Sequence, residues 1–287
     1  MVGIAASGLP RIVKLLAVLG AVISLSSTAT EAQVLYAADG AGGNSTTNLY
    51  IVNPATGAVV STIGPIGFPV TGLAFHPATG VLYGTTGGEV GTPSLVSIDT
   101  LTGAGTLIGA NGQGPVADIS FRADGTLFGW SEGSDDLVTI SLATGVATVV
   151  SDSGLGTSGS GIAFSPSGTL FFAGSGSNGM LRTIDPATGA PTDVAVMTGG
   201  PAPNRVNAMA FNSAGVLFGS VRGGTLVTIN TTTAAVTTVG STGLSSLDAL
   251  AFGPAAQALV IPTMSQWSVI VLGLLIAGSL VFLRRRA

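Results

Sequence analysis

Few side chains in this 287-residue sequence have the chemistry of a catalytic group. The chain has one histidine, His76, and no cysteine, which excludes thiolate metal ligands, cysteine nucleophiles and disulfides. A Ser-His-Asp hydrolase would need His76 beside a serine that it activates. His76 instead opens the segment His76-Pro77-Ala78-Thr79-Gly80, in a slot where equivalent segments carry Arg122, Ser165 and Asn212. We interpret it as a turn residue and predict no catalytic residue.

Two local groups of side-chain oxygens are of the type that Ca²⁺ takes as ligands. Asp39 lies near Asn44, and Glu132 lies near Asp135 and Asp136. Neither group has the spacing of an EF-hand loop. We expect solvated loops at both places and no metal or cofactor, with Ca²⁺ binding as the alternative.

The composition describes a folded, weakly charged protein. Hydrophobic residues make up 46% of the chain and charged residues 8%, which excludes disorder driven by charge. Positive charge is concentrated at the ends, in Arg11, Lys14 and residues 284–286, and only four arginines lie between them among twelve acidic residues. Phosphate backbones require clustered cations, so a nucleic-acid partner is excluded.

The middle of the chain repeats one unit five times. Its first marker is a triplet that begins with an aliphatic residue or Met and ends in Phe, at residues 73–75, 119–121, 162–164, 209–211 and 250–252. Three further short segments, rich in β-branched or aromatic residues, belong to each unit and are bounded by Gly, Pro, Asn or Asp. Four strands in a repeat of about 44 residues are typical of a propeller blade. The sequence therefore predicts an all-β, five-bladed β-propeller with four-stranded blades over residues 33–258.

The turns between the third and fourth strands share a pattern such as Asp185-Pro186-Ala187-Thr188-Gly189. The leading polar side chain caps its own turn, and the glycine supplies a positive φ. The fifth copy, Asn230 to Ala234, lacks the glycine, so we expect a looser turn there.

These repeats resemble bacterial surface propellers with NHL-type or YVTN-type blades, in which the Leu-Ala-Phe strand is innermost. The resemblance implies that residues 249–252 pair with residues 34–38 and close the ring. An open β-solenoid is the alternative architecture.

A propeller offers two places for a site. Propeller lactonases hold a metal in the central channel with Glu, Asn and Asp side chains, and Asp118, Asn207 and Asp248 fall near one channel mouth, although no Glu shares that register. The second place is the face with long, variable loops, because binding residues concentrate on loops. Trp130 is expected there with Glu132 and Asp135, either stacking on a sugar ring or anchoring its loop.

The N-terminal segment has the layout of a secretory signal. Arg11 and Lys14 precede an apolar run over 15–25, and small residues follow it. The run is short for a membrane span, so we expect residues 1–32 to be a signal peptide, with an uncleaved anchor as the alternative.

The C-terminal segment has three parts. Ile261-Pro262-Thr263-Met264-Ser265-Gln266-Trp267 precedes an uncharged stretch over 268–283, and Arg284, Arg285 and Arg286 follow it. The stretch covers roughly 24 Å as a helix, enough for a transmembrane helix, and the basic end favours a cytoplasmic C-terminus. The segment 261–287 resembles the IPTL-type C-terminal sorting domain of Gram-negative bacteria, a relative of the PEP-type signals that exosortases process. Met264, Gln266 and Ser268 depart from its Leu, Glu and Gly.

Together these features predict a secreted, non-catalytic propeller that passes through the inner membrane and is sorted to the cell envelope. The resemblance of the tail implies an exosortase-like processing enzyme as one partner. Extracellular polysaccharide or a surface protein is the expected ligand of a structural or adhesive role. A lactonase-like metal hydrolase and a protein-binding scaffold are the two alternatives.

Overall fold

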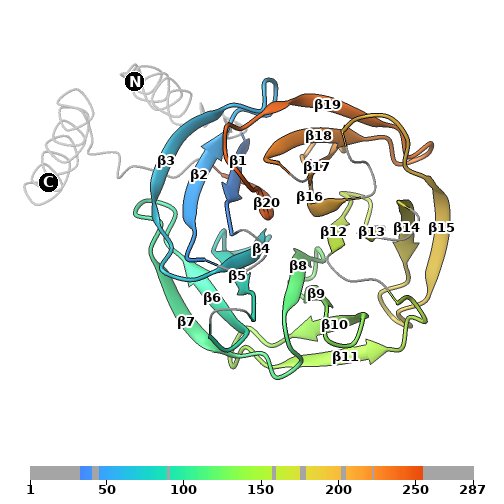
Figure 1. Ribbon diagram of the computed structural model, residues 1–287. Helices are drawn as coiled ribbons and strands as arrows, with labels where there is room; N and C mark the ends of the chain where they lie inside the picture. The colour runs from blue at the N-terminus through green and yellow to red at the C-terminus, as the bar shows by residue number, and fades with distance from the viewer. Residues whose placement is uncertain are drawn as a thin grey trace, which may run out of the picture. The chain divides into compact units, whose positions relative to one another are not determined.

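Twenty strands form five four-stranded antiparallel sheets arranged in a ring (Figure 1). The computed structural model describes residues 33–40, 45–88, 91–156, 160–174, 179–201, 205–221 and 223–254. The predicted five-bladed propeller is confirmed. The signal segment 1–32, the sorting motif 261–267, the span 268–283 and Arg284 to Arg286 lie outside the described residues.

Each blade places its four strands in order from the ring centre outwards. Blade 1 contains β20 (Ala249–Pro254), β1 (Gln33–Ala38), β2 (Asn48–Val52) and β3 (Val59–Pro65). Blade 2 contains β4 (Val70–Phe75), β5 (Leu82–Thr86), β6 (Ser94–Ile98) and β7 (Gly105–Ala110). Blade 3 contains β8 (Val116–Phe121), β9 (Leu127–Ser131), β10 (Asp136–Ile140) and β11 (Ala147–Ser151). Blade 4 contains β12 (Ser160–Phe164), β13 (Leu170–Gly174), β14 (Met180–Ile184) and β15 (Pro191–Val196). Blade 5 contains β16 (Val206–Phe211), β17 (Leu217–Val221), β18 (Thr225–Ile229) and β19 (Val236–Ser241).

The ring closes between the two ends of the described chain. Strand β20 pairs antiparallel with β1, in a register that runs from Gln33 opposite Pro254 to Ala38 opposite Ala249. The predicted closure is therefore confirmed, because the last strand completes the blade that the first strand begins. Without β20, strand β1 would have an unpaired inner edge.

The apolar core is divided into five clusters, and each lies between two neighbouring blades. Leu73 belongs to the cluster that contains Tyr36 and Leu49 of blade 1, while Ala74 next to it belongs to the cluster that contains Ile119 of blade 3. Alternate side chains of a strand point to opposite faces, so each inner strand presents a large face to one neighbour and a small face to the other. The inner strands therefore pack on a neighbouring blade with both faces.

An aromatic pair joins every neighbouring pair of blades. In each, the Phe at or near the end of an inner strand contacts an aromatic ring on the second strand of the preceding blade, with ring centroids 5.1 to 5.6 Å apart. The five pairs are Tyr36–Phe75, Tyr83–Phe121, Phe128–Phe164, Phe171–Phe211 and Phe218–Phe252. Tilted rings at this separation attract each other by about 0.5–1.5 kcal/mol beyond their burial.

The turns set up two different faces. Short turns join the first strand to the second and the third to the fourth, and we call this side the turn face. Connections of variable length join the second strand to the third and one blade to the next on the opposite side. We call this side the long-loop face, because it includes the connections over 39–47 and 197–205, although others, such as 132–135, are short. Gln33 and Pro254, which lie opposite each other in the β1–β20 pair, are both at the turn face. The described chain therefore enters and leaves the ring on the same side.

The turn at Asn230 is as tight as the other four, contrary to expectation. Ala234 adopts a positive φ of 56°, and its N–H donates to the carbonyl of Asn230 at 2.8 Å, as the Gly57 N–H does to Asn53. A left-handed conformation costs a residue with a side chain about 1–2 kcal/mol. The Ala234 methyl group is fully buried in the core between blades 4 and 5, and this burial offsets part of the cost.

Candidate functional site

The ring axis is occupied by one carboxylate. Asp118 lies on the inner strand β8 and is fully buried. Its Oδ2 accepts the backbone N–H of Ile162 on β12 and of Met209 on β16, both at 3.0 Å, and its Oδ1 accepts the N–H of Ile119 at 2.9 Å. One side chain therefore connects the inner strands of three blades.

Only small residues occupy the same register in the other four blades. They are Gly72, Gly161, Ala208 and Ala249. A Cβ on Gly72 would lie 2.8 Å from the Asp118 Cα, and a Cβ on Gly161 would lie 3.1 Å from the Met209 nitrogen. The inner strands thus approach one another closely at Gly72 and Gly161, and backbone N–H groups of the inner strands supply the hydrogen bonds of Asp118.

Burial and hydrogen bonding act on Asp118 in opposite directions. Burial raises the pKa of the Asp118 carboxyl well above its ordinary range, and the N–H groups of Met209, Ile162 and Ile119 oppose that rise. All three contacts are donors, so the carboxylate serves to hold blades together. Asp118 is not a free ligand at the channel mouth.

The other two residues predicted at the channel mouth do meet. Asn207 Nδ2 donates to Asp248 Oδ1 at 3.2 Å, and Ser246 Oγ donates to the same oxygen at 2.7 Å. Within the described ranges, no three His, Cys, Asp or Glu side chains gather closely enough to hold a metal ion. The structure therefore brings together Asn207 and Asp248, while the third predicted residue, Asp118, is hydrogen-bonded to backbone N–H groups instead.

Trp130 is inside the protein, so of its two expected roles the stacking on a sugar ring is wrong. It lies on strand β9, not on a loop, and is 0% exposed. Its ring packs on Phe172 of blade 4, with centroids 4.1 Å apart. Phe128 lies two residues earlier on the same face of the strand and faces the same core, which leaves no ring face open to a ligand.

The acidic loop after Trp130 is tied to the next connection along the chain. Asp136 Oδ1 accepts the N–H of Ser153 at 2.7 Å, and Ser153 Oγ donates to the Asp135 carbonyl at 2.7 Å. Asp135 adopts a φ of 57°, and burial first and the charge of Asp136 second raise the pKa of its carboxyl. Asp136 therefore has a structural partner, while Glu132 and Asp135 are half-buried at the surface.

Asp39 has a similar structural role in blade 1. Its two oxygens accept the N–H of Asn48 at 3.0 Å and the hydroxyl of Tyr50 at 2.8 Å. Burial raises the pKa of Tyr50, and its hydrogen bond to Asp39 adds to the rise. Asn44, the second residue of this predicted oxygen group, lies outside the described residues.

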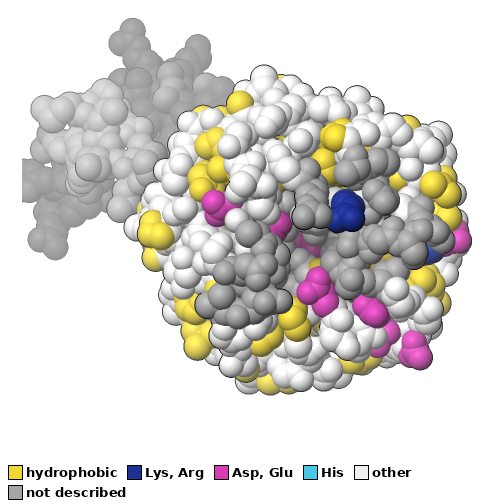
Figure 2. Space-filling view, in the orientation of Figure 1, with side chains coloured by type: hydrophobic (Ala, Val, Ile, Leu, Met, Phe, Trp, Pro, Cys, Tyr) yellow, Lys and Arg dark blue, Asp and Glu magenta, His cyan; other side chains and the backbone are white. Residues whose placement is uncertain are grey.

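The long-loop face is predominantly acidic. Figure 2 shows this face, with acidic side chains near its middle and towards its lower side. The acidic residues that the described loops and strand ends place there are Asp39, Glu132, Asp135, Asp136, Asp152 and Asp248. Asp39, Asp136 and Asp248 accept hydrogen bonds from neighbouring segments, so much of this charge serves loop structure.

Gly129-Trp130-Ser131-Glu132-Gly133 fits the Gly-x-Ser-x-Gly pattern of a nucleophile elbow, but the context differs. Such an elbow lies between a strand and a helix and exposes its serine. Ser131 is 0% exposed at the end of β9, the chain returns as strand β10, and Ser131 Oγ donates to the Gln113 carbonyl at 3.0 Å. This serine is a structural residue.

His76 is a turn residue, as expected. Its Nδ1 accepts the N–H groups of Ala78 and Thr79, both at 3.2 Å, and its ring lies 5.0 Å from that of Phe121. It lies on the turn face, whereas Ser131 lies towards the long-loop face. The two residues therefore do not form a catalytic pair.

Comparison with family models identifies the end of the chain. Residues 261–286 match the model of the IPTL-CTERM motif. The tail is an IPTL-CTERM motif. Residues 123–256 match DUF6923, a repeat of unknown function, which agrees with the repeated blades. A chain with an IPTL-CTERM motif behind a propeller fits an exported cell-envelope protein. Among the residues that the structure describes, no helix is long and apolar enough to cross a membrane.

Similar solved structures agree on the fold. A chain from the nidogen/laminin complex is 14% identical with a TM-score of 0.50, covering 79% of this chain and 100% of that one. A protein of unknown function from Bacteroides thetaiotaomicron is 15% identical with a TM-score of 0.51, covering 75% of this chain and 66% of that one. Identities this low show the fold alone. No curated protein matches the chain.

Proposed function

We propose that this protein is a non-catalytic propeller displayed at the cell envelope, where it binds an extracellular polymer or a surface protein. An exosortase-type enzyme would process its IPTL-CTERM tail after residues 1–32 direct export and 268–283 hold the chain in the inner membrane. The observation that carries the non-catalytic role is the arrangement at the ring axis. The carboxylate nearest the axis, Asp118, accepts three backbone N–H groups and has a structural use in the fold.

One observation favours the metal-hydrolase alternative. Asn207 and Asp248 are in contact beside the axis, and amide and carboxylate oxygens are ligands for Ca²⁺. Asp248 already accepts two hydrogen bonds on one oxygen, which supports a structural use of this residue as well.

Metal analysis of the purified full-length chain separates the two functions. The protein should contain no stoichiometric Ca²⁺ or Zn²⁺, and Asp248→Ala should not change its metal content. Asp152→Ala is the matched control, because Asp152 is an exposed acid that accepts the N–H of Gly154, two residues along the same loop. One equivalent of metal that is lost in Asp248→Ala and kept in Asp152→Ala would overturn the non-catalytic proposal.

Surface display is tested in the native host. An epitope can be inserted after Gly67, because this residue lies in an exposed turn where even a side chain on Gly67 would contact nothing within 4 Å. Antibody should label intact cells that carry the tagged chain. A signal obtained only after the envelope is broken would contradict display at the surface.

A further inference from the structure

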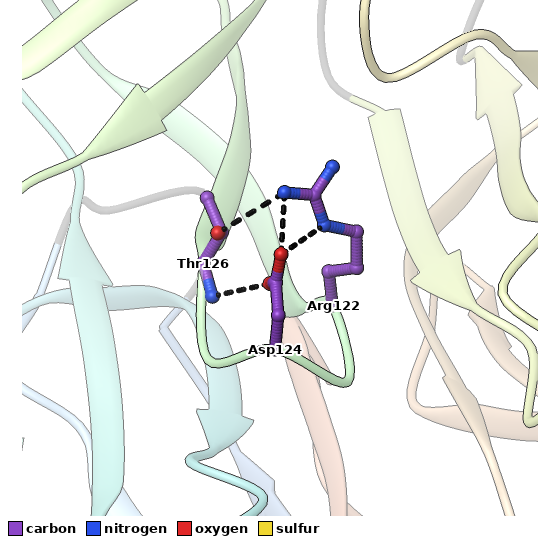
Figure 3. A network of polar contacts seen from close by, with 3 residues as sticks. All are labelled: Arg122, Asp124 and Thr126. Atoms are coloured by element: carbon purple, nitrogen blue, oxygen red, sulfur yellow. Dashed lines mark hydrogen bonds and ion pairs between the residues drawn. The ribbon is translucent and has the colours of Figure 1, made fainter.

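On the turn face, a side chain from the turn between the first and second strands lies over the aromatic pair at two blade junctions. We call such a side chain the cover of the pair. In blade 3 the guanidinium of Arg122 lies 5.3 Å from the centroid of the Phe128 ring. Asp124 holds it there through an ion pair of 2.6 Å, and Thr126 accepts a further hydrogen bond, as Figure 3 shows. In blade 2 the ring of His76 meets Phe121, the partner of Tyr83 at the next junction, edge-on with centroids 5.0 Å apart.

Blade 4 has the same turn without the cover. Ser165 and Ser167 occupy the positions of Arg122 and Asp124, and the glycine that follows keeps its left-handed φ, 89° in blade 4 and 87° in blade 3. The N–H of Ser165 donates to the Thr169 carbonyl at 2.8 Å, as that of Arg122 does to Thr126 at 2.9 Å. The two turns therefore share this hydrogen bond and the left-handed glycine, and they differ in the covering side chains and in Pro166, which stands where blade 3 has Ala123.

The missing cover leaves a hollow of about 320 Å³ between blades 4 and 5. The aromatic pair Phe171–Phe211 forms part of its lining, and Phe171 is 8% exposed where Phe128 is 2% exposed. Five hydroxyl side chains surround the pair: Ser165, Ser167, Thr169, Ser213 and Thr231. A volume of this size is at the lower end of the range for small-molecule sites.

The lining contains hydroxyl groups and aromatic rings but no ionisable side chain. Ser165 and Ser167 already share a hydrogen bond of 2.9 Å between their hydroxyls, and Ser165 Oγ accepts the N–H of Thr169. A hydroxyl can donate one hydrogen bond and accept others, so the group as a whole still suits a ligand that is itself rich in hydroxyl groups. The aromatic edge suits a flat apolar surface on the same ligand. An anion or a cation would find no opposite charge among the lining residues.

We propose that this hollow, the blade 4–5 groove, binds one unit of a neutral saccharide. The inference rests on the proposed role in binding an extracellular polymer and names the class of that polymer. It places the sugar site on the turn face, where the described chain ends at Pro254, and not on the long-loop face.

The test uses the full-length chain in a detergent without a sugar headgroup. Saturation-transfer NMR and calorimetry with D-glucose, D-galactose and D-mannose should show saturable binding of at least one sugar, at one site per chain. The double variant S165R/S167D places the blade 3 cover over the groove and should weaken this binding at least tenfold. Its melting temperature should stay close to that of the wild type, because the same turn already carries these residues in blade 3.

The reverse exchange provides the matched control. R122S/D124S should uncover Phe128 and Phe164 and create a second groove, so that the number of bound sugars rises from one to two. Binding of none of the three sugars, or binding that S165R/S167D leaves unchanged, would overturn the groove proposal. Either result would leave surface display untouched, whereas a failure of surface labelling would leave sugar binding in solution unchanged.

Discussion

Replacing Asp118 by alanine tests whether its carboxylate holds the ring together. The change removes the acceptor of two cross-blade N–H groups, those of Ile162 and Met209. A buried donor without an acceptor costs about 1–3 kcal/mol, so the free energy of unfolding should fall by about 2–6 kcal/mol. Relief from burying a charge offsets part of this loss and places the result in the lower half of the range. Even so, this loss is a large fraction of the free energy of unfolding of an ordinary domain, roughly 5–15 kcal/mol.

Urea unfolding of the purified chain, followed by near-ultraviolet circular dichroism, measures the loss. Asp118→Asn should cost less than Asp118→Ala, because an amide oxygen can still accept the N–H groups of Ile162 and Met209. Asp152→Ala should change stability by less than about 1 kcal/mol, since it is exposed. Formate should restore stability to Asp118→Ala by occupying the vacated acceptor position. If Asp118→Ala unfolds at the wild-type urea concentration, the carboxylate does not join the blades.

Three further predictions concern pH, close packing and closure. Because burial raises the pKa of Asp118, the native state holds the proton of this carboxyl more tightly than the unfolded chain does. The stability advantage of wild type over Asp118→Ala should therefore be greatest below about pH 4 and shrink as the pH rises through the pKa of the folded state. A difference in stability that does not change with pH would contradict this. Gly103→Ala should lower the melting temperature more than Gly67→Ala. Both glycines have a φ near 80°, but of the two only Gly103 would place a Cβ close to another atom, 2.6 Å from the Gly64 carbonyl oxygen. Equal effects of the two substitutions would refute the close contact. Deleting 247–254 should expose the inner edge of β1 and produce aggregates in size-exclusion chromatography; a monomer with an unchanged melt would count against ring closure.

The fold is predictable from the sequence because each repeat contains its own strand and turn signals. The triplet ending in Phe75 recurs at Phe252, and that surplus final strand predicts the β1–β20 pairing that the structure contains. The tight turn at Ala234 is not predictable in this way, because a sequence pattern does not show how well a buried methyl group offsets a strained φ.

The site is less predictable because side-chain use depends on contacts between blades. Asp118 is the one charged residue at a strand position that the other four blades fill with Gly or Ala. Its hydrogen-bond donors in the other blades, however, are 44 and 91 residues away in the sequence. Trp130 looks like a loop residue only if β9 ends before it; alternation from Phe128 directs it to the core. The sequence does contain an indication of the blade 4–5 groove, because Ser165 occupies the position that holds Arg122 and His76 in other blades. This difference can be interpreted only when the structure shows the aromatic pairs that those side chains cover.

Intact-mass measurement tests whether the propeller is exported and released through its IPTL-CTERM tail. Protein should be recovered from the envelope and medium of a host that contains an exosortase. The recovered chain should end near Thr263, and Pro262→Ala with Trp267→Ala should retain full-length protein at the inner membrane. Recovery of only full-length chain that still carries Arg284 to Ala287 would contradict release through the tail.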